Sequence, residues 1–155
     1  MGSRTRNIAT LAGAALLTAV SFAGAAKAET VVIEMLNINP ANPGTVMVYN
    51  PGVTRANVGD TIVFKSVDPA HNAVSIEGMI PAGAEPFNSP ISQDFEYVVT
   101  EEGTYGFYCV PHSGLGMAGL ILVGDHTVNL EEAKAVRHSS PLLGQRFQAL
   151  FAEVE

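Results

Sequence analysis

Four side chains in this sequence have the types and spacing of a copper site. Cys109, His112 and Met117 follow one another as Cys-x2-His-x4-Met between two strand-like segments, and His71 lies upstream in the run Pro69-Ala70-His71-Asn72. A thiolate, two imidazoles and a weak axial thioether form the ligand set of a blue-copper electron-transfer site. The sequence therefore predicts one copper ion per chain, bound by these four residues.

The mixed ligand set also indicates what such a site would do. Thiolate and thioether ligands favour Cu(I), whereas imidazoles also suit Cu(II). A site suited to neither state alone needs little rearrangement when an electron moves, which favours rapid transfer. Because protein side chains would fill all four positions, no position remains open for a substrate. We therefore expect an electron carrier and not an enzyme.

Other metal chemistries fit these residues less well. Met is a poor ligand for zinc, and the two-copper centre of oxidases needs two cysteines where this chain has one. Copper enzymes with several ions need further histidines, and the remaining two, His126 and His138, are predicted to be ordinary surface residues of a polar tail. A copper-delivery or copper-buffer protein is the main alternative, although delivery sites are usually open and rich in Met and His.

The first 28 residues have the pattern of a secretory signal peptide. Two arginines precede an uncharged apolar run over residues 8–23, and Ala26-Lys27-Ala28 supplies a small-x-small cleavage pattern. The run is about 16 residues long, shorter than the roughly 20 that span a bilayer. We expect cleavage before Glu29, no membrane insertion, and one monomeric domain of residues 29–155. In an oxidising compartment, the lone Cys109 indicates a metal ligand, a reactive thiol or pairing between chains.

The charge of the chain restricts its partners. The formal net charge is −7, and removal of residues 1–28 would lower it to −10, because that segment contains three basic residues and no acidic one. A strongly negative chain is disfavoured from binding nucleic acid or anionic lipid. Neutral or basic protein partners are expected instead.

The segments that must position the ligands read as strands up to residue 123. They are rich in Val, Ile, Thr, Phe and Tyr, are separated by Asn-Pro, Pro-Gly and Gly-Asp turn signals, and have no helical crossover between them. This pattern favours an all-β sandwich over a parallel α/β fold. Odd-numbered positions of residues 95–99 are predicted to face inward. The predicted strands are Thr30–Leu36, Thr45–Tyr49, Thr61–Ser66, Asp94–Thr100, Thr104–Cys109 and Ala118–Val123.

The pattern changes to helix in residues 124–155, a predicted extension of the sandwich formed by residues 29–123. Asn129 followed by Glu132 predicts a capped helix over Leu130–Arg137. Ser140-Pro141 predicts the start of a second helix, with proline at its first position. That helix carries one apolar stripe, formed by Leu143, Phe147, Leu150 and Phe151. We expect the stripe to cover apolar sheet surface.

These motifs resemble those of the cupredoxins, the family of small blue copper proteins. The Cys-to-Met spacing is shared by plastocyanin, but residues 71–84, residues 34–37 and the helical tail resemble a different branch of the family. The resemblance covers essentially the whole mature chain. It implies a Greek-key sandwich of eight strands with two short C-terminal α-helices and a periplasmic location. It also implies transfer of single electrons to a redox protein such as a copper or haem reductase or a c-type cytochrome.

The resemblance also implies roles for residues beside the ligands. The backbone N–H of Asn72 is expected to donate to the sulfur of Cys109, and its side chain to hold the second ligand loop. Pro111 has no N–H, which spares the sulfur a hydrogen bond and raises the reduction potential. Met47 is expected to pack near His112, and the lysines that relatives carry around this edge are absent. Candidates for an apolar docking patch around the exposed histidine are Leu36, Met47, Met79, Pro81, Pro111 and Leu115.

Overall fold

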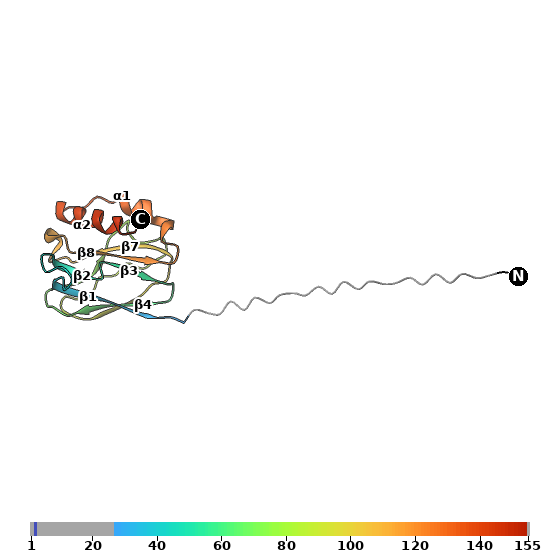
Figure 1. Ribbon diagram of the computed structural model, residues 1–155, viewed down its shortest axis with the longest axis horizontal. Coiled ribbons are helices and arrows are strands. Elements are labelled where there is room, and N and C mark those ends of the chain that lie inside the picture. The colour runs from blue at the N-terminus through green and yellow to red at the C-terminus, as the bar shows by residue number, and fades with distance from the viewer. Residues whose placement is uncertain (1, 3–26, 155) are drawn as a thin grey trace.

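Two four-stranded sheets pack face to face in the computed structural model, which describes residue 2 and residues 27–154 (Figure 1). The predicted signal peptide lies almost wholly outside the described residues. The first sheet has the strand order β2-β1-β4-β6 and the second has the order β3-β8-β7-β5. The strands are β1 (Thr30–Ile38), β2 (Val46–Asn50), β3 (Val53–Ala56), β4 (Thr61–Ser66), β5 (Val74–Ser75), β6 (Phe95–Val98), β7 (Gly103–Tyr108) and β8 (Ala118–Val123).

Both sheets are mixed, and the all-β sandwich predicted from the sequence is confirmed. Strands β1 and β4 pair in parallel, as do β3 and β8, while the other pairs are antiparallel. No helix lies between the members of the β1–β4 pair, so this is not an α/β fold. Strands β3 and β5 are absent from the predicted set, because segments of four and two residues are too short to show an alternating pattern. Phe95, Tyr97 and Val99 are more buried than the residues between them, as predicted.

Aromatic rings fill the space between the sheets. Phe107 of β7 has its ring centroid 4.7 Å from that of Tyr49 and 5.1 Å from that of Phe64, both in edge-to-face arrangements that suit the ring quadrupoles. All three rings are buried. The same cluster includes Cys109 and Met117, both with no exposed surface. Two of the predicted copper ligands therefore belong to the packed interior.

The helices α1 (Leu130–Ala135) and α2 (Pro141–Ala152) cover the outer face of the sheet that contains β7 and β8 (Figure 1). Strand β8 is buried on both faces: Ile121 and Val123 pack into the sandwich core, whereas Leu120 and Leu122 pack with the apolar stripe of α2. The predicted stripe and its role are confirmed. Proline occupies the first turn of α2 and the hydroxyl of Ser140 accepts from the N–H of Leu143, as expected of the helix start. Among the described residues, no helix has both the length and the apolar character needed to cross a membrane.

Two predictions about the tail are wrong. Asn129 precedes α1 but makes no side-chain cap; its Oδ1 accepts from the N–H of Thr104 at 2.7 Å and its Nδ2 donates to the carbonyl of Thr104 at 2.9 Å. The pairing with β7 has displaced the capping bond and fastens the tail to the sheet. His138 is half-buried and stacks on Phe147 with ring centroids 4.5 Å apart, so it is not an ordinary surface residue.

Candidate metal centre

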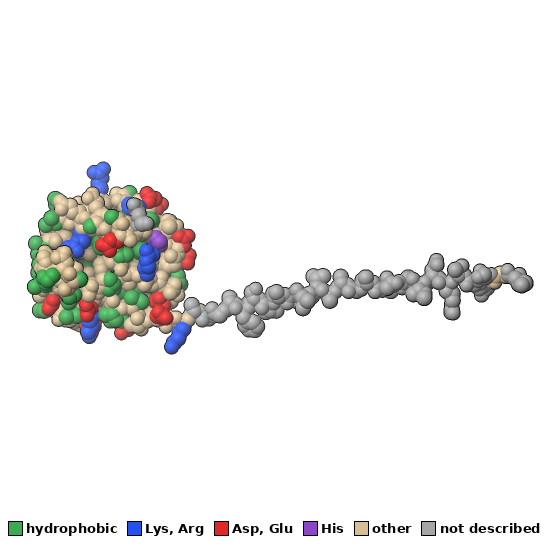
Figure 2. Space-filling view, in the orientation of Figure 1, with side chains coloured by type: hydrophobic (Ala, Val, Ile, Leu, Met, Phe, Trp, Pro, Cys, Tyr) green, Lys and Arg blue, Asp and Glu red, His purple; other side chains and the backbone are tan. Residues whose placement is uncertain are grey.

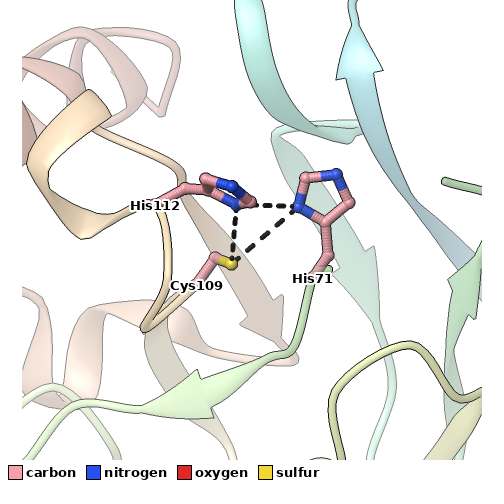
Figure 3. A group of neighbouring side chains, drawn as sticks. All are labelled: His71, Cys109 and His112. Atoms are coloured by element: carbon pink, nitrogen blue, oxygen red, sulfur yellow. Dashed lines mark hydrogen bonds between the residues drawn. The ribbon is translucent and has the colours of Figure 1, made fainter. Parts of the chain in front are cut away.

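The side chains of His71, Cys109 and His112 point toward one another at one end of the sandwich (Figure 3). The Nδ1 atom of His71 lies 3.0 Å from Nδ1 of His112 and 3.9 Å from Sγ of Cys109. The same sulfur lies 3.4 Å from Nδ1 of His112. The loop between β4 and β5 and the loop between β7 and β8 thus direct three soft or borderline donor atoms to one point, although His71 and Cys109 are 38 positions apart in the chain.

The size of this triangle fits a single metal ion. Its three separations place the corners about 2.0 Å from a common centre, and metal–nitrogen and metal–sulfur bonds in proteins are about 2.0–2.3 Å long. Two imidazoles and one thiolate in a three-cornered arrangement are the equatorial donors of a blue-copper centre. The donor set and its spacing therefore both suit copper.

The loop after β7 supplies two of these residues and holds its shape through its own backbone. The N–H of Cys109 donates to the carbonyl of Met117 at 3.0 Å, and the N–H of Met117 donates to the carbonyl of His112 at 3.3 Å. A single 3-10 turn, Ser113–Leu115, lies between them. Met117, the fourth predicted ligand, is thus fixed beside the other two and is fully buried.

Gly116 closes this loop in a way that needs glycine. Its φ of +77° is in the left-handed region, and a Cβ at this position would lie 2.7 Å from the carbonyl oxygen of Leu142 in the first turn of α2. No other residue type avoids both the strain and the clash. The second helix therefore packs directly on the ligand loop.

His71 is placed by the segment between β4 and β5. Its carbonyl accepts from the N–H of Ser92 at 2.9 Å, and the N–H of Ala70 donates to the hydroxyl of Ser92 at 2.8 Å. Ala70 and Ser92 both have positive φ, 71° and 59°. Non-glycine residues with left-handed backbone often cluster at functional sites, where surrounding contacts hold them. Here they fix the chain on either side of the buried imidazole.

Asn37 orients the imidazole of His71, a contact that the sequence analysis does not predict. The Nε2–H of His71 donates to Oδ1 of Asn37 at 3.0 Å across 34 positions of the chain. With the proton on Nε2, the lone pair of Nδ1 points at Cys109. Such outer contacts fix the tautomer of metal-binding histidines. The contact depends on which loops are neighbours in the folded chain, and no local sequence pattern indicates that.

The residues expected beside the ligands have these contacts. Oδ1 of Asn72 accepts from the N–H of Val110 at 2.9 Å, which ties the two ligand loops together, and its backbone N–H is directed at the sulfur of Cys109. The hydroxyl of Tyr49, in the core, donates to the carbonyl of Asn72 at 2.5 Å. Pro111 lies exposed on the loop, and Met47 packs, half-buried, on the cluster that contains Cys109 and Met117.

Burial sets the protonation of the predicted ligands His71 and Cys109 in the absence of metal. Burial raises the pKa of the Cys109 thiol, while the N–H groups of Asn72 and His112 act in the opposite direction. Burial, followed by the neighbouring His112, lowers the pKa of His71, and Asp68 opposes them. The imidazole is therefore kept neutral, the form that binds metals, and metal binding would release the thiol proton.

His112 alone among the four predicted ligands is not fully buried. On its own loop, Val110 and Leu115 are 48% and 51% exposed. The predicted apolar patch is wrong in part. Leu36, Met79 and Pro81 are buried. A Cβ at Gly106 would touch Met79 and one at Gly103 would touch Pro81, so residues 79–81 pack inward against β7.

Comparison with known proteins agrees with this geometry. Residues 37–124 match the model of the family described as copper binding proteins, plastocyanin/azurin family. The chain is 39% identical to the pseudoazurin of Methylorubrum extorquens over 147 residues, which cover 95% of this chain and 97% of that protein. It is 40% identical to the pseudoazurin of Paracoccus pantotrophus over 126 residues, or 81% and 83% of the two chains. The chain belongs to the pseudoazurins.

The solved structures agree in fold as well as in sequence. The crystal structure of pseudoazurin from Methylobacterium extorquens AM1 matches with a TM-score of 0.75 and 39% identity, covering 81% of this chain and 99% of that one. The fold is thus the cupredoxin sandwich with two short C-terminal helices, and the branch indicated by the sequence resemblance is confirmed. Copper is the metal of this family, and electron transport is its class of function.

Proposed function

We propose that the chain is an exported, periplasmic carrier that takes up and releases single electrons at one copper ion held by His71, Cys109, His112 and Met117. The observation that carries the assignment is the triangle of two Nδ1 atoms and one Sγ atom, with separations of 3.0, 3.4 and 3.9 Å. Bound copper supplies the one-electron couple of such a site.

The protein side chains provide a rigid site around that couple. The Asn37 amide holds the ring of His71, and the Asn72 side chain fastens the ligand loop to the neighbouring segment. Burial of Cys109 and Met117 excludes water from the sulfur donors. A site held in this way changes little between two oxidation states, so little free energy is spent on reorganisation. Each of these contacts favours transfer over binding of a substrate.

Electrons are proposed to pass through His112. It is the one predicted ligand with exposed surface, and the loop that bears it presents Val110 and Leu115 to solvent. An apolar rim of this kind allows a protein partner to approach closely and to leave quickly. We propose a redox protein as that partner, a copper or haem reductase or a c-type cytochrome.

Export is proposed from the leader pattern of residues 1–28, which leaves residues 29–155 as the mature domain. Every strand and helix described lies within residues 30–152, so this domain contains the whole sandwich and both helices. A copper-delivery role fits less well, because His71, Cys109 and Met117 are all buried and a delivery site must release its metal readily.

Copper stoichiometry and the visible spectrum test the ligand assignment. The copper-loaded chain should bind one ion and show an intense absorption band in the red, which arises from charge transfer between the Cys109 thiolate and copper. Cys109→Ser should lose the band and most of the copper, because a hydroxyl is a poor soft donor. His126→Ala, a histidine outside the site, should keep both. A blue Cys109→Ser protein with full copper would overturn the assignment.

A further inference from the structure

The start of β1 lies beside the start of β4 (Figure 1). A buried carboxylate, Asp60, directly precedes β4. Asp60 is 3% exposed. Its Oδ1 accepts from the backbone N–H of Glu29 at 2.8 Å, and its Oδ2 accepts from the backbone N–H of Asn57 at 2.7 Å. The two N–H groups, Asn57 first and Glu29 second, hold the pKa of Asp60 below its ordinary value, and burial opposes them.

The charge of this carboxylate has no cationic partner in the described part of the chain. The ion pairs found there join Lys65 to Asp94 and Lys134 to Glu131. The charged residues next to Asp60 in the chain, or on the segments that hydrogen-bond around it, are Lys27, Glu29, Arg55, Glu101 and Glu102. No ion pair joins any of them to Asp60, and Lys27 belongs to the leader that cleavage would remove. A buried carboxylate is costly unless it is paired with a cation or well hydrogen-bonded, and a cation here would lower that cost.

The backbone of Glu29 is held firmly in place at this carboxylate. Its carbonyl accepts from the N–H of Thr61 at 2.8 Å, and Thr30 is paired with Thr61 in the parallel ladder of β1 and β4. The nitrogen of Glu29 is thus fixed against Asp60 by contacts on both sides. Ala28 and Glu29 are exposed, so the peptide bond between them lies at the surface, where a peptidase can reach it.

We propose that Asp60 is a built-in binding site for the α-ammonium group that is created when the leader is cut before Glu29. This inference rests on the proposed removal of residues 1–28 and is independent of the copper assignment. Hydrolysis of the Ala28–Glu29 bond adds water: the hydroxyl joins the carbonyl carbon of Ala28 and the other hydrogen of the water goes to the nitrogen of Glu29. The new carboxyl group then passes its proton to the same nitrogen, which gives a carboxylate on Ala28 and an ammonium group on Glu29. An amide hydrogen bond to Asp60 thereby becomes an ion pair.

The ion pair has a defined pH dependence. An α-amino group ordinarily titrates at about 7.7–8.0, and a carboxylate in hydrogen-bond contact raises that pKa, by about one unit for a partly exposed pair. Because the folded-state pKa is raised, the added stability is fully present below about pH 7.7 and is lost as the pH rises through the folded-state value. The mature protein should therefore gain stability that its precursor lacks.

The test begins with the full chain, expressed with its own leader and purified after export. Mass spectrometry of the intact product should give Glu29 as the first residue; any other start would overturn the inference. The comparison variant has one alanine inserted between Ala28 and Glu29, which keeps the amide hydrogen bond to Asp60 but moves the ammonium group into solvent. The visible copper band is read in every sample, and the inference requires it to be unchanged.

The pKa of the α-amino group is measured by pH-dependent acylation of the N-terminus. The proton affinity of this group should be about tenfold higher in the natural product than in the insertion variant. The midpoint of thermal unfolding should be higher for the natural product at pH 6 and equal for the two at pH 10. Asp60→Asn should abolish the difference, whereas Asp125→Asn, at an exposed carboxylate, should leave it. Equal α-amino pKa values in the natural product and the insertion variant would overturn the inference. This comparison holds even if the Asp60→Asn variant fails to fold.

Discussion

Asn37 decides which nitrogen of His71 faces the other ligands. An amide oxygen can only accept, so the imidazole must carry its proton on Nε2 and leave Nδ1 free. The sequence predicted the four ligand positions, and the structure brings His71, Cys109 and His112 within bonding distance of one point. It did not predict Asn37, because a contact between side chains 34 positions apart leaves no periodic signal.

Met117 is expected to tune the site and not to create it. Its thioether would be a long, weak axial donor, so Met117→Gln should keep one copper per chain and lower the reduction potential. His71→Ala, which removes an equatorial donor, should lose most of the copper. Potentiometry and metal analysis on the two variants would decide the matter. Equal loss of copper from both would exclude the axial role.

The loop after β7, which carries Cys109 and His112, is supported by helix α2. Gly116→Ala should destabilise the fold by about 1–3 kcal/mol, since alanine at a φ of +77° is strained and its Cβ would press on the carbonyl of Leu142. That contact should push α2 away from the loop that carries Cys109 and His112, and the visible spectrum of the copper-loaded protein should change as well. Gly114→Ala is the matched control, because a Cβ there has open space around it.

Chemical denaturation and absorption spectra on the two glycine variants give the answer. If Gly116→Ala is as stable as Gly114→Ala and has the same spectrum, then α2 does not support the ligand loop.

At the level of elements, the sequence was informative where patterns are long. Strand β8 and helix α2 were predicted, because six and twelve residues show their periods clearly. Strand β5 has two residues and is defined by its pairing with β7 and by a bridge between Val74 and Asn88. Met79 is predicted to lie in an exposed patch, yet the small Gly106 on β7 leaves a space that Met79 fills. The partner that a loop packs on is set by tertiary contacts and not by local sequence.

The charge of the whole molecule sets its encounters with partners. Figure 2 shows basic and acidic side chains scattered singly over one face, without a continuous basic surface. A mature chain of net charge −10 should therefore react slowly with an acidic reductase at low salt, and the rate should rise or stay level as salt screens the repulsion over about 10 Å at 0.1 M.

Leu115→Glu should lower the bimolecular rate with the partner by about tenfold or more, because it places a charge on the exposed rim beside His112, while the visible spectrum stays the same. Stopped-flow measurements over a range of ionic strength test both expectations. A rate with the acidic reductase that falls steeply with added salt would reveal a basic docking face, and a normal rate for Leu115→Glu would place docking elsewhere.

The proposed role as an electron carrier is tested most directly by reversible redox cycling of the copper-loaded protein. The blue band is followed during repeated reduction and reoxidation in the presence of a copper chelator. We expect uptake and release of one electron per chain with full return of the band after each cycle, because His71, Cys109 and Met117 are buried, Asn37 holds the ring of His71 and Asn72 holds the loop after Cys109. Steady loss of copper to the chelator on reduction would contradict the carrier role and favour copper delivery.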